Sequence, residues 1–336
     1  MRIGLLTTSF PRHAGDYAGS FVGDRVQCLL DAGHSVEVLA AGDRPATAVD
    51  GRLTVRRIPA AARLFYGEGA PEVLERGGAI WLAAAQFSAA LAAAAGVRAA
   101  GWEALESHWL VPCALAASAA APNGARRAYA HSGDVALLER LPLGRAIARR
   151  LARDGTDLRF VSHDLQARFA RLCGEAGALG TVEPLDVPLS LFAPRGGPNL
   201  ALRRRFGLTA PTVLAVGRLV PIKGHAALLH ACARARARAF AAPRPEVVIL
   251  GDGPERPRLI RLAAALEVPL RLAGAVPRAE VADWLRAADL FAHPSVRLPN
   301  GRTEGAPIAA REAQAVGIPV VATADVAVLA RAIAGL

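Results

Sequence analysis

Lysine is almost absent from this chain of 336 residues: all but one of its 40 basic residues are arginine. The single lysine is Lys223. Forty basic against 29 acidic residues give a formal net charge of +11. Since the excess reflects a general use of arginine, it is weak evidence for nucleic acid, and we expect no nucleic-acid partner. Anionic partners such as a phosphorylated substrate, an acidic glycan or a membrane surface remain open.

Cysteine is also sparse: the four cysteines are scattered, and no pair has C-x-x-C spacing. This pattern favours reduced thiols in a cytoplasmic protein. The first residues, MRIGLLTTSFPRH, have one arginine before a very short apolar run, so they do not resemble a signal peptide. We therefore expect a cytoplasmic protein, with peripheral contact at the inner face of the membrane as a further expectation.

One uncharged stretch, AIWLAAAQFSAALAAAAGV at 79–97, is about as long as a membrane span. It consists mostly of alanine, which is barely apolar, and Gln86 and Ser88 interrupt it. We expect a buried helix rather than a membrane span.

Short apolar strands alternate with helices along the chain. In the first half, strands are expected at 2–6, 33–40, 53–59, 125–131 and 158–162, with a helix at 20–32. In the second half, strands are expected at 212–217, 246–250, 270–274, 290–295 and 318–323, with helices between them. This rhythm predicts two α/β domains, each a Rossmann-like, doubly wound parallel sheet.

The rhythm is interrupted where proline and glycine cluster at 183–199. We place an interdomain linker at 186–199, between an N-terminal domain of residues 1–185 and a C-terminal domain of residues 200–336. In such sheets, ligands bind beyond the carboxyl ends of the strands, where loops lead into helix N-termini.

An anion site is predicted in VLAVGRLVPIKGHAALL, at 213–229. The strand ends at Gly217, Arg218 follows at once, and Lys223 precedes Gly224, which opens a helix. Two cations and a helix N-terminus at one place favour phosphate. The alternative is a solvated loop that carries two cations. The P-loop pattern G-x-x-x-x-G-K-[ST] is absent.

Gly251 and Gly253 follow the next strand in ILGDGPE. Their amides could approach a ligand closely, or the two glycines could serve only a tight turn. A third glycine at the dinucleotide spacing is missing, which argues against a nicotinamide-dependent oxidoreductase.

Two carboxylates, Glu304 and Glu312, lie in TEGAPIAAREA at 303–313. Glu304 and Gly305 end a loop, and Pro307 favours the start of a helix. Glu312 is then about two turns further along the chain. Carboxylates accept hydrogen bonds strongly from sugar hydroxyls, so the pair can hold two parts of one ligand.

Taken in order, VGRLVPIKG, ILGDGPE, AADLFAHPS and EGAPIAAREAQAVGIPVVAT resemble the C-terminal half of the family 4 retaining glycosyltransferases. SFPRHAGDYAGSFV, AGHSVEVLA, SHWLVPCALAA and YAHSGDVALL are similar to the N-terminal half. The resemblance implies the GT-B fold, with two Rossmann-like domains facing an interdomain cleft. It also implies transfer of a sugar from a nucleotide-sugar, most often UDP- or GDP-linked, to a glycan or lipid-linked acceptor.

The resemblance also implies roles in the donor site. Arg218 and Lys223 would hold the diphosphate and stabilise it as the leaving group. Glu312 would bind the ribose hydroxyls, and Glu304 would contact the transferred sugar. The donor-site glycines would be Gly217, Gly251, Gly253 and Gly305.

On the acceptor side, His131 in AHSGDV would lie at the reaction centre, and Gly19 would belong to a mobile loop near the phosphates. No D-x-D motif and no His/Cys cluster offers a metal site, so we expect neither a metal nor another cofactor. Cationic side chains would take the metal's place at the leaving phosphate.

One departure from the family pattern bears on activity. After GIPVVAT the family continues with a Gly-rich segment and a further strand pair, whereas here VVAT runs directly into ADVAVLARAIAGL. We expect a C-terminal domain that is incomplete at this end, without some of the backbone donors to the phosphates. The competing hypothesis is therefore a catalytically impaired relative that binds nucleotide-sugars or acts as a scaffold.

Overall fold

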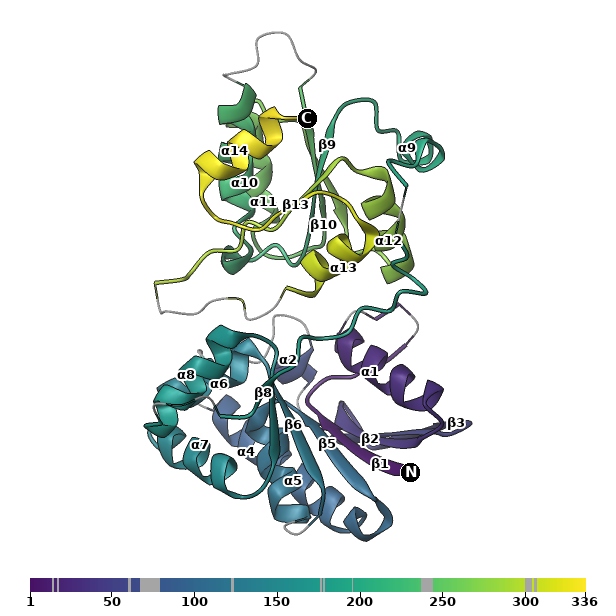
Figure 1. The fold of residues 1–336 in the computed structure, drawn as a ribbon, viewed down its shortest axis with the longest axis vertical. Coiled ribbons are helices and arrows are strands. Elements are labelled where there is room, and N and C mark those ends of the chain that lie inside the picture. Colours follow the sequence, from purple (N-terminus) through teal and green to yellow (C-terminus); the bar gives the residue numbers. More distant parts are fainter. Residues whose placement is uncertain are drawn as a thin grey trace. The chain divides into compact units, whose positions relative to one another are not determined.

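The computed structural model spans residues 1–336 and describes all of them except 14, 17, 60–61, 67–78, 122–123, 176, 178, 195, 237–243, 300–303 and 305–306. Contacts within the chain divide it into two compact units, Met1–Asp186 and Val187–Leu336. Each unit is a sheet of mainly parallel strands covered by helices, so the mixed α/β prediction is confirmed (Figure 1).

The N-terminal unit contains an eight-stranded sheet in the order β3-β4-β2-β1-β5-β6-β7-β8. Its strands are β1 (Arg2–Thr7), β2 (Ser35–Gly42), β3 (Ala46–Asp50), β4 (Leu53–Pro59), β5 (Ala104–His108), β6 (Arg126–Ala130), β7 (Asp157–Phe160) and β8 (Thr181–Val182). All pairings are parallel except β3 with β4, which are antiparallel. The sequence interpretation did not include β3, β5 or β8. All five residues of β3 are exposed and lack the apolar periodicity of a buried strand, β5 carries Glu106, Ser107 and His108 among its five residues, and β8 has only two residues.

Helices cover both faces of this sheet. They are α1 (Ser20–Asp31), α2 (Ala62–Phe65), α4 (Ala79–Gly96), α5 (Leu115–Ala120), α6 (Ser132–Arg140), α7 (Gly144–Arg153) and α8 (His163–Cys173), with short turns η1 (Ala99–Gly101) and η2 (Leu110–Ala114). Val22, Val26 and Leu29 of α1 pack with Leu5 and Val38 in one core. A second core joins α4 and α5 to other side chains of the same strands.

The helix expected at 79–97 exists as α4, but it is not buried all round. Phe87, Leu91 and Ala95 face the core at a spacing of four residues, whereas Trp81 is 39% and Leu82 62% exposed. The prediction of a buried helix is therefore wrong for the outer face, where small alanines make exposure inexpensive. Among the described residues, no helix combines the length and apolarity needed to cross a bilayer.

The C-terminal unit has a five-stranded parallel sheet in the order β11-β10-β9-β12-β13. Its strands are β9 (Thr212–Val216), β10 (Glu246–Leu250), β11 (Leu270–Gly274), β12 (Leu290–Ala292) and β13 (Val320–Val321). Its helices are α9 (Leu200–Phe206), α10 (His225–Arg236), α11 (Arg256–Ala265), α12 (Arg278–Ala287), α13 (Ile308–Val316) and α14 (Val326–Ala334), and η3 (Pro221–Lys223) is a single 3-10 turn.

Two separate cores lie on the two faces of this second sheet. Helices α10, α11 and α14 pack on one face through side chains such as Leu228, Leu259 and Leu329. Helices α12 and α13 cover the other, with Trp284 and Val316 in that core. Figure 1 shows the same layering, with the sheet between the two sets of helices. The alternation of strand and helix along the sequence dictates this doubly wound arrangement.

The segment before α9 packs with the second unit. Phe192 is fully buried in the core of α12 and α13, and Val187 and Leu191 lie against the same cluster. The assignment of 186–199 as an interdomain linker stays a prediction.

Strand order reverses direction at one place in each sheet. In the first unit, the chain moves from β1 outward to β2 on one side and later to β5 on the other. In the second, it moves from β9 to β10 on one side and later to β12 on the other. At such a switch point the loops leaving the two central strands diverge, and ligands of open α/β sheets bind there. Residues that follow β1, β5, β9 and β12 are thus the first to consider.

Candidate functional site

A cluster of charged and polar side chains gathers at the switch point of the C-terminal unit. Lys223 ends the turn that follows β9, and its ammonium pairs with Oε1 of Glu304. Both side chains are largely buried. The structure therefore brings together two residues that the sequence assigned to the donor's phosphate and to its sugar.

The other oxygen of Glu304 is held by residues that follow β12. Its Oε2 lies 2.9 Å from Nε2 of His293, and it also accepts a hydrogen bond from the Ser295 hydroxyl. The Ser295 hydroxyl is 2.8 Å from the same histidine nitrogen. Each oxygen of this carboxylate thus has its own partners.

These contacts set the ionisation of Glu304. Burial alone would raise the pKa of Glu304, but the hydrogen bond with His293 and the charge of Lys223 outweigh it and hold that pKa well below its ordinary value. Nearby, burial and the charge of Lys223 lower the pKa of His225 to about 4. Glu304 is accordingly a carboxylate, and His225 a neutral imidazole, at neutral pH.

Gly217 and Gly224 make room for this arrangement. A Cβ at Gly217 would lie 3.0–3.3 Å from the Lys223 side chain, and φ at that glycine is 154°. A Cβ at Gly224, where φ is 66°, would lie 2.0 Å from the carbonyl oxygen of Pro294. Arg218 follows Gly217 directly, and its carbonyl oxygen lies 3.3 Å from Nε2 of His225. Both glycines are required by backbone geometry and close approach.

The glycines of the loop after β10 have a packing role. A Cβ at Gly251 would meet the carbonyl oxygen of Gly217 at 2.0 Å, and one at Gly253 would meet that of Leu219 at 2.6 Å. The amide of Gly251 donates to the Gly274 carbonyl, and that of Gly253 to Asp252 Oδ1. These contacts support the alternative that the two glycines serve a tight turn. A role of the same glycines in ligand binding stays a prediction.

Glu312 is buried on α13 and faces the first turn of α12. Its Oε1 accepts from Nε and Nη2 of Arg278, at 2.9 and 2.6 Å. The guanidinium also lies over the ring of Phe192, with its central carbon 5.2 Å from the ring centroid. A ribose bound by Glu312 would share this carboxylate with Arg278. Gly305, the remaining glycine assigned to the donor site, lies outside the described residues.

The helix after β13 begins with a carboxylate cap. Asp325 Oδ1 accepts from the amides of Ala327 and Val328, at 2.7 and 3.2 Å. Asp325 also follows the short strand Val320–Val321 by only a few residues. Amides that could otherwise meet an external anion are therefore already bonded to an internal one.

The N-terminal unit places His131 in a different environment. It follows β6, is buried, and has its Nε2 3.3 Å from Nδ1 of His108, which ends β5. The two imidazoles are stacked, and the rings of Phe21 and Trp109 lie against His131 at centroid distances of 4.9 and 4.6 Å. Burial lowers the pKa of His131 to about 3, so this ring is neutral at physiological pH.

Asp134 connects the loops that follow β5 and β6. Its Oδ2 accepts from the amides of Leu110 and His131, at 2.7 and 3.2 Å. Trp109, between these two strand ends, has the left-handed φ of 85°, which is a strained conformation for a residue with a Cβ. Burial raises the pKa of Asp134 to about 7.

Gly19 lies where the loop after β1 enters α1, with φ of 71°. A Cβ there would meet the Ser9 carbonyl oxygen at 2.3 Å. Asp16 organises the loop by accepting from the Arg12 side chain at 2.6 Å and from the amide of Ala18 at 3.1 Å. The structure thus describes this loop as internally bonded; its predicted position near phosphates stays a prediction.

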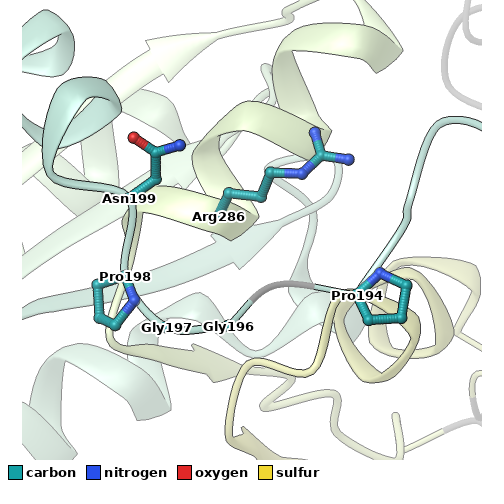
Figure 2. Close-up of a pocket in the computed structure, with 6 residues that line it drawn as sticks. All are labelled: Pro194, Gly196, Gly197, Pro198, Asn199 and Arg286. Carbon is teal, nitrogen blue, oxygen red and sulfur yellow. The ribbon is translucent and has the colours of Figure 1, made fainter.

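A separate hollow of about 330 Å³ lies beside the segment that leads into α9 (Figure 2). It is lined by Pro194, Gly196, Gly197, Pro198, Asn199 and Arg286. Figure 2 shows the two glycines as bare backbone between the prolines. Arg286 donates to the carbonyl of Leu191 at 2.6 Å, and Asn199 caps α9. These side chains therefore have structural partners, and the hollow shares no lining residue with the cluster around Glu304.

The sequence interpretation missed several side chains that complete these clusters. His293, Ser295, His108, Asp134 and Arg278 each contact a predicted residue. For His293 the available signal was position, because it directly follows the buried strand β12, whereas His108 is the last residue of β5, a strand that the sequence interpretation did not include.

The fold defines a class: a two-unit α/β protein with a doubly wound sheet in each unit. The C-terminal part matches the model of the family described as glycosyl transferases group 1, over residues 202–334. The match lies within the C-terminal unit and confirms the resemblance found in the sequence for that half.

A curated relative is the GDP-mannose-dependent alpha-(1-6)-phosphatidylinositol monomannoside mannosyltransferase of Mycolicibacterium smegmatis. It is 34% identical over 227 residues, which are 65% of this chain and 58% of the relative. The chain therefore spans less than two thirds of the length of the curated relative that it matches.

Solved structures show the fold. Sucrose-phosphate synthase from Thermosynechococcus elongatus has a TM-score of 0.71 at 18% identity, covering 96% of this chain and 80% of that one. HepE from Anabaena, solved in complex with UDP, has a TM-score of 0.66 at 19% identity with the same two coverages. At these identities the likeness establishes the GT-B fold alone.

Proposed function

We propose that the protein is a retaining glycosyltransferase that moves a sugar from a nucleotide-sugar to a lipid-linked or glycan acceptor. The observation that carries the proposal is the cluster at the β9/β12 switch point. There, Lys223 lies beside the ionised carboxylate of Glu304, and Arg218 follows the same strand. The cations suit a diphosphate leaving group, and the carboxylate suits a sugar. His131 would face the acceptor.

A GDP-sugar is the first donor to test, because the relative from Mycolicibacterium smegmatis is named as GDP-mannose-dependent. UDP-sugars are the second, because HepE was solved with UDP. The lipid-linked acceptor is supported by the same relative's name, which specifies a phosphatidylinositol mannoside. We propose a reaction without a metal, in which Arg218 and Lys223 balance the charge on the leaving diphosphate.

The test combines binding with turnover. Calorimetry with GDP, GDP-mannose, UDP and UDP-glucose identifies the nucleotide, and radiolabelled transfer to extracted lipid acceptors, with and without a metal chelator, measures the reaction. Transfer with the anomeric configuration preserved is the expected result. Absence of binding to all four nucleotides by the folded protein would reject the proposal.

A second candidate, a nucleotide-sugar-binding relative with impaired catalysis, is favoured by the carboxylate cap on α14. Asp325 occupies amides that could serve a phosphate. Inserting a Gly-rich family segment between Thr323 and Ala324 tests this candidate. Losing one preorganised donor costs roughly 2.7–4 kcal/mol in related settings, so a chimera at least a hundredfold faster is expected if donors are missing. Equal turnover by the two proteins would exclude the impaired-relative hypothesis.

We also propose weak, peripheral contact with anionic membranes through α7. Arg145, Arg149, Arg150 and Arg153 are exposed, whereas Leu151 is buried inward, so attraction would be electrostatic rather than insertion of an apolar face. Each cation near such a surface contributes about 1 kcal/mol. Flotation with phosphatidylserine vesicles at low salt, lost at high salt, is expected. Absence of flotation at low salt would reject this contact.

A further inference from the structure

The partners of Glu304 come from different parts of the C-terminal unit, and those parts are tied together by the main chain. The amide of Val296 donates to the carbonyl of Ile222 at 2.9 Å, which joins the segment after β12 to the turn that carries Lys223. The amide of His293 donates to the carbonyl of Val321 at 2.8 Å, which anchors the backbone of His293 to β13. The backbone that carries His293 is therefore tied both to β13 and to the turn that carries Lys223.

Glu304 itself belongs to no helix or strand, since it precedes α13 at Ile308. Its carboxylate bridges the two anchored side chains: Oε1 meets Lys223 and Oε2 meets His293. An ionised carboxylate has no proton to donate, so Nε2 of His293 carries the hydrogen in this contact. The Ser295 hydroxyl then donates to Oε2 as well, because the neighbouring histidine nitrogen is already a donor.

We propose that His293 is a positioning residue for Glu304. It fixes the orientation of the carboxylate against Lys223, and so determines how the transferred sugar, rather than the diphosphate, is held. Ser295 supports the same oxygen. This inference rests on the proposed glycosyltransferase function, and nothing in that function requires a histidine at this position.

Substitution of His293 should have a different effect from substitution of Lys223. Removing its imidazole leaves Oε2 with the Ser295 hydroxyl alone but keeps the contact between Oε1 and Lys223, so the cation that serves the diphosphate keeps its place. A hydrogen bond to a charged acceptor is typically strong enough to change a rate by about 10- to 100-fold. The effect should appear in the sugar-dependent step, because interactions made at the reacting centre alter turnover more than ground-state binding.

The experiment compares His293→Ala, His293→Gln and Ser295→Ala with wild type and with His230→Ala. His230 is an exposed histidine on α10 and serves as the matched control. Thermal unfolding confirms folding of each variant. Calorimetry then measures affinity for GDP and for GDP-mannose, with UDP and UDP-glucose as the second pair, and transfer assays give kcat and KM.

We expect GDP affinity to stay within about twofold in every variant, and kcat of His293→Ala to fall about 10- to 100-fold. Glutamine can place an amide donor near the position of Nε2, so His293→Gln should recover most of the loss. Ser295→Ala should show a smaller loss, and His230→Ala none. Equal losses of GDP and GDP-mannose affinity with unchanged kcat would overturn the proposal, because they would indicate a merely structural role.

A second readout is independent of turnover. Long-range ¹H–¹⁵N spectra of the folded protein should show a proton on Nε2 of His293 that shifts in Glu304→Gln but not in His230→Ala. If wild type binds no nucleotide but this shift is present, the proposed function fails while the positioning contact stands. If nucleotide-sugar is transferred but the Nε2 proton is unaffected by Glu304→Gln, the inference about His293 fails alone.

Discussion

The two units place a histidine at the same topological position but surround it with opposite chemistry. In the N-terminal unit, His131 and His108 contact each other inside a shell of aromatic rings. In the C-terminal unit, His293 contacts a carboxylate that also binds an ammonium. The first cluster lowers histidine basicity by burial, and the second holds charges by pairing them. A common sheet edge therefore does not determine the electrostatics of a site; the neighbouring side chains do.

The largest expected effect is on nucleotide affinity, which should depend on the C-terminal cluster and not on the N-terminal one. Lys223→Ala and Arg218→Ala should each weaken GDP or UDP binding by about 1.5–3 kcal/mol, roughly 10- to 100-fold, because each removes a charge-assisted contact. His131→Asn should leave nucleotide affinity within about twofold, because a neutral ring offers phosphate no charge. Calorimetry on the three variants measures the contrast. Unchanged affinity in both cation variants would contradict the anion site.

The next prediction concerns pH and the N-terminal cluster. Burial takes the pKa of His131 from 6.5 to about 3, so between these values the unfolded chain binds a proton that the folded protein excludes. The free energy of unfolding therefore falls as pH falls through this window, by up to about 1.4 kcal/mol per pH unit. Urea unfolding of wild type and His131→Asn at pH 7 and pH 5 measures the difference.

Asp134 provides the control of opposite sign. Its pKa is raised from 3.8 to about 7, so the folded protein holds a proton that the unfolded chain releases, and stability is lost as pH rises through this window. Asp134→Asn should remove that loss. The assignment of the acid response to His131 is wrong if the stability difference between wild type and His131→Asn is the same at both pH values.

The smallest predicted effect has a sign that the sequence would not suggest. Glu304 is paired with Lys223 before any ligand is present, so a diphosphate must share the ammonium with a carboxylate. Neutralising that carboxylate in Glu304→Gln should strengthen GDP binding by about 1 kcal/mol, the scale of one charge contact close to water. Glu312→Gln serves as the comparison, because its carboxylate pairs with Arg278 rather than with Lys223. Weaker GDP binding by Glu304→Gln would show that the pair assists the anion instead of competing with it.

Apolar periodicity was sufficient to predict most of the fold. The strands that became β1, β9 and β10 bury runs of aliphatic residues, which a short sequence window reveals. Strand β3 was missed because its residues are all exposed and show no apolar periodicity, and β5 and β8 were missed because one is largely polar and the other has only two residues. The outer face of α4 was misjudged because alanine tolerates both burial and exposure.

The sequence identified residues of the candidate site, but it did not predict which side chains they contact. Lys223 and Glu304 were identified, yet they are 81 residues apart, and nothing in either segment indicates that their side chains meet. The pairing of Glu312 with Arg278 was likewise invisible, because any of the many arginines could have supplied that guanidinium. Side-chain pairing depends on how loops from separate strands converge, which a local pattern does not contain.

Asp134 has one further consequence, for local opening of the backbone. Because one carboxylate oxygen accepts the amides of both Leu110 and His131, the loops after β5 and β6 cannot open separately without losing a shared acceptor. Their amide protons should therefore exchange with solvent deuterium as a single cooperative unit, at a common rate, although 21 positions separate them in the sequence. Trp109, with its strained backbone, directly precedes Leu110. Relaxation of its φ angle and opening of the loop after β6 should therefore occur together.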